Sequence, residues 1–200
     1  MSAALLLPPQ TGAEALPRKR FTREEFDRLI ESGFFEGQRC ELIDGDLIDK
    51  IGQNPPHAFA VQLAHNWLAS LGLTNSIRVQ LPIEASPADR GRSVPEPDLS
   101  VLAEDKSEFA RRFPRGDELL LAIEIADSSA SFDLSRKSVL YAAACVPEYW
   151  VLDLPRRRLV VHREPSEAGY RLIRFFAEGE TVTLENRTET VRVGDLLPAE

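Results

Sequence analysis

The central apolar run of the sequence reads Leu119-Leu120-Leu121-Ala122-Ile123-Glu124-Ile125-Ala126. A run with one charge among apolar side chains is typical of a strand buried on both faces of a sheet. Because side chains alternate along a strand, Glu124 shares a face with Ala122 and Ala126. A carboxylate in such a strand costs free energy unless it is paired with a cation or binds a metal ion. The run therefore predicts a central strand that carries, at Glu124, either a structural ion pair or part of a functional site.

The first fifty residues predict a helix and a hairpin. Thr22 and Glu25 form the capping-box pattern that begins a helix. The dipeptide Asp44-Gly45 lies between two short alternating runs, which predicts a hairpin with a type I′ turn. In its first strand Glu41 and Ile43 share one face.

The rest of the chain mixes helices and strands, which predicts an α/β fold (α+β, with a mixed sheet) and a β-rich C-terminal extension. The further expected elements are a helix from about His57 to Leu71, a strand over residues 76–84, a short strand over residues 98–102, a helix from 128–131 to about Cys145, and strands over residues 148–153, 159–163, 170–175 and 181–184, with a terminal segment over 191–197.

Composition narrows the class of protein. The 200 residues include 24 Lys+Arg and 32 Asp+Glu, a net charge of −8, and 43% are hydrophobic. This predicts one domain over residues 21–200 after a flexible tail over 1–20, and it argues against a protein that coats nucleic acid or anionic membranes. The two cysteines, Cys40 and Cys145, form no CxxC pair, and no run approaches the length of a membrane-spanning helix. A soluble cytoplasmic protein is expected, without a membrane partner.

Two carboxylates on neighbouring predicted strands are the strongest candidates for chemistry. Asp98 follows Pro95-Glu96-Pro97 at the start of its strand, and Glu124 lies in the central strand. Oxygen ligands from one or two carboxylates are what Mg²⁺ prefers in proteins. Asp98 alone is equally typical of a loop cap, so the pair rather than the single residue indicates a metal site.

The predicted helix after the central strand carries Asp133, Lys137 and Tyr141 at spacings of four. Residues so spaced lie on one helix face, and a simple Asp–Lys pair there contributes a few tenths of a kcal/mol. A second interpretation is that Lys137 reaches the metal site, where it would stabilise charge on a scissile phosphate and orient the attacking water.

Taken together, these segments resemble the Uma2 family, a group of restriction-endonuclease-like proteins. The resemblance covers about residues 21–185. It implies the PD-(D/E)XK nuclease fold, with a mixed sheet of four or five strands, flanking helices and a metal held at the sheet. It is carried by Glu41-Leu42-Ile43-Asp44-Gly45, His57, Glu96-Pro97-Asp98-Leu99-Ser100-Val101, Glu124-Ile125-Ala126-Asp127-Ser128-Ser129, Asp133…Lys137…Tyr141 and Val146-Pro147-Glu148-Tyr149-Trp150-Val151-Leu152-Asp153.

The resemblance implies a role for each matching residue. Asp98 and Glu124 match the acidic motif residues, and Ala126 stands where the motif lysine would be, so Lys137 is expected to supply that lysine. The expected cofactor is Mg²⁺ or Mn²⁺. Its expected ligands are Asp98, Glu124, the backbone carbonyl of Ile125 and Glu41. Supporting residues are Tyr141, Asp133 and His57; for His57 we favour a helix-capping role over orientation of the site.

Two arginine clusters are candidates for contact with nucleic acid. Each is equally typical of a solvated surface, and no base-reading motif accompanies them, so the expected partner is DNA held weakly through its phosphates. A homodimer is also expected. The clusters are Arg111, Arg112 and Arg115, and Arg156 with Arg157.

The sequence therefore predicts a metal-dependent endonuclease that hydrolyses DNA phosphodiester bonds. The alternative is a catalytically weak nuclease-like scaffold that binds nucleic acid or a protein partner, which the replaced motif lysine and the net charge of −8 favour. A two-carboxylate glycosidase is less compatible, because aromatic residues are only 8% and mostly follow strand patterns. Walker A, G-x-G-x-x-G and G-x-S-x-G motifs are absent.

Overall fold

A six-stranded mixed sheet forms the centre of the computed structural model, which describes residues 18–50, 54–104 and 107–199. The strands lie in the order β3-β4-β5-β6-β7-β8; β5 and β6 are parallel, and every other neighbouring pair is antiparallel. Their bounds are β3 Ile77–Val79, β4 Leu99–Leu102, β5 Leu119–Ala126, β6 Glu148–Asp153, β7 Arg158–Ser166 and β8 Gly169–Ala177.

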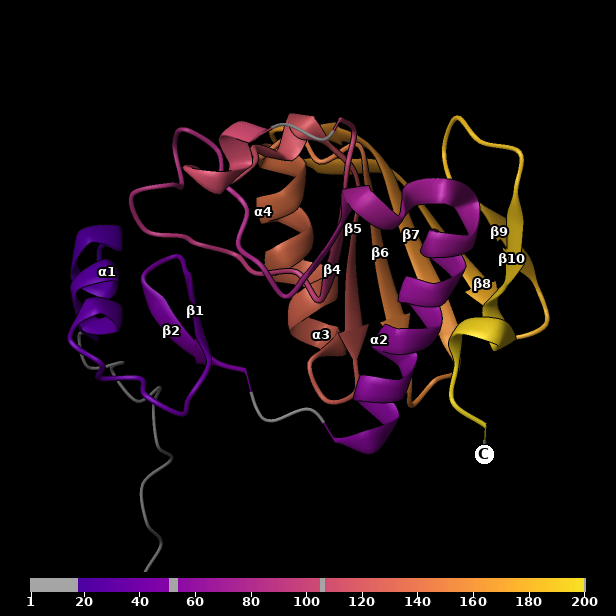
Figure 1. Ribbon diagram of the computed structural model, residues 1–200, viewed down its shortest axis with the longest axis horizontal. Coiled ribbons are helices and arrows are strands. Elements are labelled where there is room, and N and C mark those ends of the chain that lie inside the picture. Colours follow the sequence, from indigo (N-terminus) through magenta and orange to yellow (C-terminus); the bar gives the residue numbers. More distant parts are fainter. Residues whose placement is uncertain (1–17, 51–53, 105–106, 200) are drawn as a thin grey trace, which may run out of the picture.

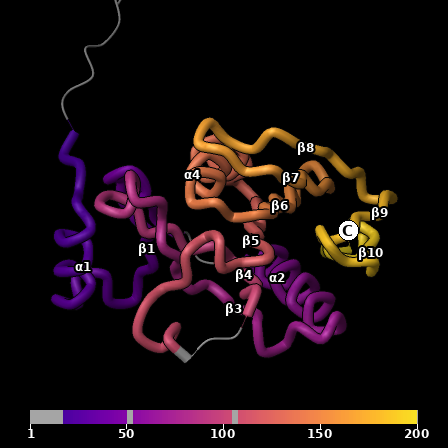
Figure 2. The backbone as a smooth tube through the Cα atoms, turned by 90° about the horizontal axis from the view of Figure 1, so that it is seen from above, coloured from indigo at the N-terminus to yellow at the C-terminus, as the bar shows by residue number. Residues whose placement is uncertain are grey.

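Strand β5 is the apolar run that predicted a central strand, and it lies inside the sheet between β4 and β6. Leu121, Ile123 and Ile125 pack into a core shared with helix α2 (Pro55–Leu68). Ala122 and Ala126 pack into a second core on the opposite face of the sheet. Tyr141, Ala144 and Val146, which precede β6, cover that face. Figure 2 shows the sheet between α2 on one side and α4 (Ser138–Ala143) on the other. Glu124 therefore faces α4, as strand alternation predicts.

Helix α2 begins two residues before the expected start. Pro55 and Pro56 occupy its first turn, where a backbone N–H would have no partner within the helix, so that the N–H that proline lacks is not missed. The Asn54 side chain accepts the N–H of His57. The capping role that we favoured for His57 is therefore wrong, because Asn54 performs it. After Leu68 the chain continues through a wide π-helical turn, Ala69–Leu73, and a 3-10 turn, Thr74–Ser76.

The helix expected after β5 is built in three parts. Helix α3 (Ala130–Phe132) leads into a π-helical turn, Asp133–Lys137, and then into α4 (Ser138–Ala143). The wide turn is the part that residue spacing did not predict. No helix in the described ranges is both long and apolar enough to cross a membrane.

The N-terminal part forms a separate layer beside the sheet (Figure 1, left). Helix α1 (Arg23–Glu31) begins with the predicted capping box, in which Thr22 and Glu25 bond reciprocally. Strands β1 (Cys40–Ile43) and β2 (Asp46–Asp49) form the predicted hairpin. Its two turn residues, at positions 44 and 45, have φ of 54° and 81°, as a type I′ turn requires.

The hairpin packs on two neighbours with its two faces. Leu42 joins Phe26 of α1 in one small core, whereas Ile43 joins Leu140 of α4 in another. Glu41, on the same face as Ile43, is thereby directed toward α4 and the sheet. Of the tail predicted for residues 1–20, positions 1–17 lie outside the described residues, and Arg20 pairs with Asp46 of the hairpin.

Several strands differ in length from the prediction. Of the strand expected over residues 76–84, only the three residues of β3 form. Gln80 has a φ of 51°, which turns the backbone, and Pro82 has no N–H to donate to a neighbouring strand. Strands β7 and β8 are longer than expected. The last two strands, β9 (Thr181–Thr183) and β10 (Thr190–Arg192), form a sheet of their own before a 3-10 turn, Val193–Leu196.

Candidate active site

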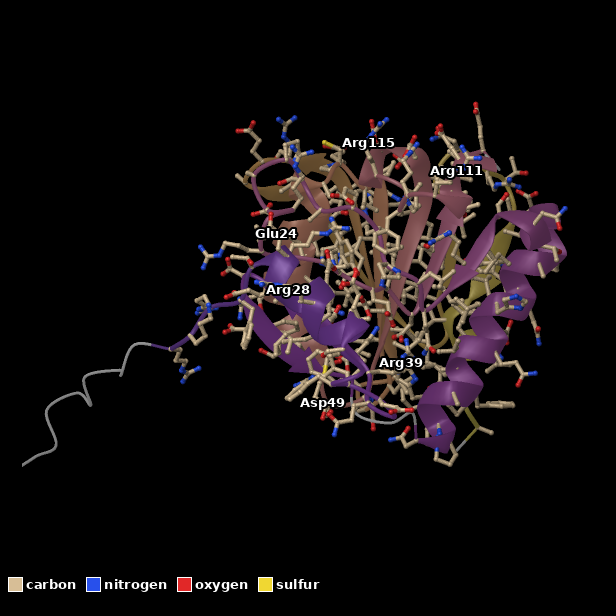
Figure 3. The ribbon with its side chains drawn as sticks, turned by 60° about the vertical axis from the view of Figure 1, so that its left-hand side comes forward. Glu24, Arg28, Arg39, Asp49, Arg111 and Arg115 are labelled. Atoms are coloured by element: carbon tan, nitrogen blue, oxygen red, sulfur yellow. The ribbon has the colours of Figure 1, made fainter. Side chains whose placement is uncertain are left out.

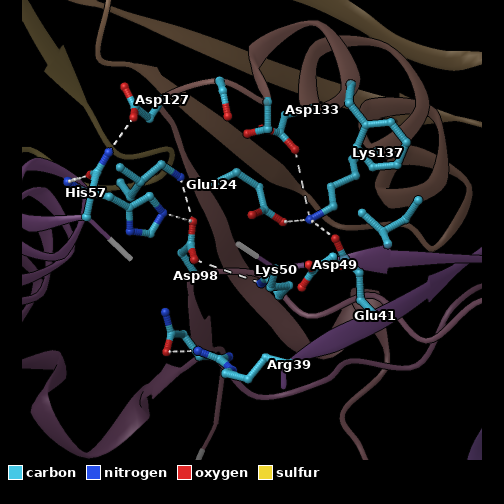
Figure 4. Close-up of a pocket in the computed structure, with 17 residues that line it drawn as sticks. Arg39, Glu41, Asp49, Lys50, His57, Asp98, Glu124, Asp127, Asp133 and Lys137 are labelled. Carbon is cyan, nitrogen blue, oxygen red and sulfur yellow. Dashed lines mark hydrogen bonds and ion pairs between the residues drawn. The ribbon is translucent and has the colours of Figure 1, made fainter. Parts of the chain in front are cut away.

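A pocket of about 200 Å³ lies where the carboxyl end of β5 meets the start of β4. The hairpin, the first turn of α2 and the segment that leads into α4 complete its walls (Figure 4). Its charged lining is mostly acidic: the carboxylates are Glu41, Asp49, Asp98, Glu124, Asp127 and Asp133, and the basic side chains are Arg39, Lys50 and Lys137.

Lys137 lies at the centre of a buried ion cluster. Its Nζ is 2.9 Å from Glu124 Oε1, 2.7 Å from Glu41 Oε1 and 3.9 Å from Asp133 Oδ1. Tyr141, one turn further along, donates its hydroxyl to the same Glu124 oxygen at 2.8 Å. The two side chains predicted to share a helix face thus both reach Glu124, and Lys137 is only 2% exposed.

Asp98 forms the second half of the site. Its Oδ2 accepts the Ile125 N–H at 2.9 Å and lies 3.2 Å from His57 Nε2, while its Oδ1 lies 3.9 Å from Lys50 Nζ. Burial acts to raise the pKa of Asp98, but the hydrogen bond from His57, the charges of Lys50 and His57, and the Ile125 N–H together lower it to about 2. Asp98 is therefore an anion at neutral pH.

The pKa values of the Lys137 cluster reflect burial and an excess of carboxylates. Burial raises the pKa of Glu124 to about 8 against the opposing charges of Lys137 and Lys50, and burial also raises the pKa of Asp133. Burial alone would lower the pKa of Lys137, yet the charges of Glu124, Glu41 and Asp133 raise it overall. A further cation would relieve this surplus of negative charge.

The donors that remain fit a hard divalent cation with water in part of its shell. Within the described ranges, Asp98 Oδ1 and Glu124 Oε2 take part in no hydrogen bond. The carbonyl of Ile125 points to the same side as its N–H, toward Asp98. Mg²⁺ is usually held by one or two carboxylates and water rather than by a closed protein cage. The described residues contain no group of three or more His, Cys, Asp or Glu side chains that could hold a metal ion, so a metal site here stays a prediction.

Glu41, the further ligand implied by the resemblance, has both oxygens engaged. Oε1 pairs with Lys137, and Oε2 accepts the Glu96 N–H at 3.1 Å. In this arrangement Glu41 orients Lys137, and its role as a ligand stays a prediction.

None of the predicted nucleic-acid arginines lines the pocket. Figure 3 shows Arg111 and Arg115 at the top of the molecule and Arg39 and Asp49 in its lower half. Four of the five arginines pair with carboxylates of the chain. Contact of these arginines with DNA stays a prediction. The pairs are Arg112–Glu118 at 2.7 Å, Arg115–Asp117 at 3.0 Å, Arg156–Asp153 at 3.4 Å and Arg157–Glu178 at 2.5 Å.

Sequence reasoning missed the basic side chains at the open end of the hairpin. The Lys50 N–H bonds to the Arg39 carbonyl at 2.8 Å, one step beyond the Cys40–Asp49 pair. Counting outward from the predicted Asp44-Gly45 turn would have paired Arg39 with Lys50. Asn54, Gln80 and Asp127 also line the pocket without having been predicted.

Comparison with known proteins assigns the chain to a family. The model of the Uma2 family, described as "Putative restriction endonuclease", matches residues 23–196. The chain belongs to the Uma2 family. This Uma2 chain is also similar to the crystal structure of "a putative nuclease belonging to DUF820" from Anabaena variabilis ATCC 29413, with a TM-score of 0.67 and 17% identity over 88% of this chain and 97% of that one.

The structural likeness confirms the expected fold class, an α/β restriction-endonuclease-like core. The search of curated proteins gave no match. Membership of Uma2 supports a nuclease-like function. Four of the residues that carried the sequence resemblance, although they come from four separate segments, line one pocket: Glu41, Asp98, Glu124 and Lys137.

Proposed function

We propose that this Uma2 protein is a divalent-cation-dependent endonuclease that hydrolyses phosphodiester bonds of DNA at the pocket. One observation carries the proposal: Asp98 and Glu124 meet in the pocket from adjacent strands, each with an oxygen that makes no hydrogen bond in the described chain, while Lys137 lies against Glu124. Carboxylates can hold a divalent cation that polarises a phosphate, and a lysine beside them can stabilise the charge that develops on it.

Asp98 Oδ1, Glu124 Oε2 and the Ile125 carbonyl would hold Mg²⁺ or Mn²⁺. When bound, the cation supplies polarisation of the phosphate and a lower pKa for the attacking water. The protein keeps these donors in place, because His57 and the Ile125 N–H hold the other Asp98 oxygen, and Tyr141 holds the other Glu124 oxygen.

Lys137 is placed to act on the water or the phosphate. An ammonium has three N–H donors; one bonds to Glu124 Oε1, and Glu41 Oε1 lies 2.7 Å away as an ion-pair partner. Its third ion-pair partner among the described residues, Asp133 Oδ1, is 3.9 Å away and beyond hydrogen-bond distance. The third N–H is therefore available to orient a water molecule or to stabilise charge that develops on the phosphate.

The substrate that fits is a polymer held briefly through its phosphates. The net charge of −8 and the pairing of most loop arginines with carboxylates support weak binding without base readout.

The test compares Asp98→Asn and Glu124→Gln with wild type and with Asp195→Asn, a matched removal of an exposed carboxylate outside the pocket. Wild type should nick or linearise supercoiled plasmid DNA in Mg²⁺ or Mn²⁺ and not in EDTA. Both pocket variants should lose about 100-fold or more in rate, and Asp195→Asn should match wild type.

Calorimetric titration with Mn²⁺ completes the design. Binding by wild type that is lost in both pocket variants supports the assignment. Cleavage by both variants at the wild-type rate would refute it. A wild type that neither cuts nor binds Mn²⁺, yet binds duplex DNA, would favour the alternative of a nuclease-like scaffold.

A further inference from the structure

Lys50 differs from Lys137 in how its ammonium contacts the carboxylates of the pocket. Its ammonium donates to the backbone carbonyl of Glu96 and stands 3.7 Å from Glu96 Oε1 and 3.9 Å from Asp98 Oδ1. It therefore faces two carboxylates without a hydrogen bond to either. Lys137, by contrast, lies at hydrogen-bond distance from two carboxylates.

Lys50 also has a route out of the pocket. It follows β2, and its side chain is 15% exposed, compared with 3% for Lys137. A lysine side chain has a flexible four-carbon stem, so the ammonium can move into water without a change in the backbone. Lys137 is enclosed between the hairpin and the sheet and has no such freedom.

The position of the Lys50 ammonium is significant because of the oxygen it faces. Asp98 Oδ2 is already occupied by the Ile125 N–H and His57, so Oδ1 is the oxygen left for a metal ion. Lys50 is the basic side chain that the structure places against Oδ1. Two cations cannot share one side of a carboxylate oxygen without repulsion.

We propose that Lys50 is a positioning residue that serves as an exchangeable counter-cation for Asp98. In the metal-free protein its ammonium balances the buried carboxylate; a divalent cation takes over Oδ1, and Lys50 withdraws toward solvent. Lys50 thus lowers the affinity of the site for the cation. This inference rests on the proposed function, since it requires that Asp98 bind a divalent cation.

The experiment measures Mn²⁺ affinity by isothermal titration calorimetry in wild type, Lys50→Met, Lys50→Gln and Lys50→Arg. The two neutral variants should bind Mn²⁺ about tenfold more tightly than wild type, because a unit charge close to the ligand is removed. Lys50→Arg keeps the charge and should remain near wild type. Lys19→Met is the matched control, since Lys19 pairs with Glu25 on the surface; its affinity should be unchanged.

Thermal unfolding supplies a second readout. Without metal, the neutral Lys50 variants should unfold at a lower temperature than wild type, and Mn²⁺ should raise their unfolding temperature more than it raises that of wild type. Neutral variants that bind Mn²⁺ no more tightly than wild type, while wild type binds it, would overturn the role of Lys50 and leave the proposed function intact. Absence of Mn²⁺ binding in wild type and all variants would overturn both.

Discussion

Lys137 is a buried cation whose stability depends on its partners. Taking an ammonium out of water costs several kcal/mol, and this cost is offset only when carboxylates with good geometry surround it. Glu124 and Glu41 provide that geometry at 2.9 and 2.7 Å. The cluster therefore ties three parts of the chain together: β5, the hairpin and the turn before α4.

Replacement of Lys137 by Met should destabilise the protein by about 3–5 kcal/mol, because it leaves buried carboxylates without their cation. Urea unfolding followed by circular dichroism measures the loss. The double variant Lys137→Met/Glu124→Gln should recover part of it, since the unpaired charge is then removed as well. Lys19→Met, at a surface pair, should change stability by less than about 1 kcal/mol. Equal stability of Lys137→Met and wild type would show that the cluster contributes no net stabilisation.

The meeting of Glu124 and Lys137 follows from periodicities that can be read along the sequence. Strand alternation predicts the face of Glu124, and a spacing of four predicts that Lys137 and Tyr141 share a face, although the turn that ends at Lys137 is π-helical and not regular. The position of Lys50 depends instead on how a distant hairpin docks against the sheet. No local pattern encodes that docking, which is why Lys50 and Arg39 were not predicted.

The hairpin is the element that brings Glu41 to the site. Because Leu42 packs toward α1 and Ile43 toward α4, the hairpin register sets which side chain faces Lys137. A slip of one residue would direct Glu41 toward the small core around Phe26. The Asp44-Gly45 turn fixes this register, and it could be predicted because few residues tolerate positive φ.

Gly45→Ala should therefore affect both stability and the site. Gly45 has a φ of 81°, and a Cβ there would lie 3.0 Å from Arg20 Cβ and 3.1 Å from the Phe21 carbonyl oxygen. Thermal unfolding should show a loss of about 1–3 kcal/mol. Gly179→Ala is the matched control, because its Cβ would meet nothing within 4 Å and its φ is not in the left-handed region. A Gly45→Ala protein with wild-type stability would show that the turn is not strained by a side chain.

Two elements show where local patterns did not suffice. The sequence after β5 predicts one regular helix, yet residues 133–137 form a π-helical turn, with the Ser138 N–H bonded to the Asp133 carbonyl. The Asp133 carbonyl also accepts the Tyr149 hydroxyl from β6 at 3.1 Å, a contact that sequence spacing does not reveal. Strand β3 is short because Gln80 has a φ of 51°, which turns the backbone after a last ladder bond from the Gln80 N–H to the Asp98 carbonyl.

At the scale of the whole molecule, the charge distribution bears on how DNA can reach the site. The pocket is lined by six carboxylates and three basic side chains, a formal charge of −3 with histidine neutral. A phosphate that approaches the metal-free pocket is therefore repelled. A bound divalent cation changes the local charge by two units and gives the phosphate a favourable partner.

Binding of DNA should accordingly depend on the divalent cation. Fluorescence anisotropy with a labelled duplex oligonucleotide, measured in Ca²⁺ to bind without cleavage and in EDTA, should give an affinity about tenfold higher with the cation. The double variant Asp98→Asn/Glu124→Gln should lose this dependence, because it lacks the oxygens that hold the cation. Equal affinity of wild type in Ca²⁺ and EDTA would contradict the pocket as the main contact and would favour the arginines near Arg111 and Arg115, which lie at the opposite end of the molecule from Asp49 (Figure 3).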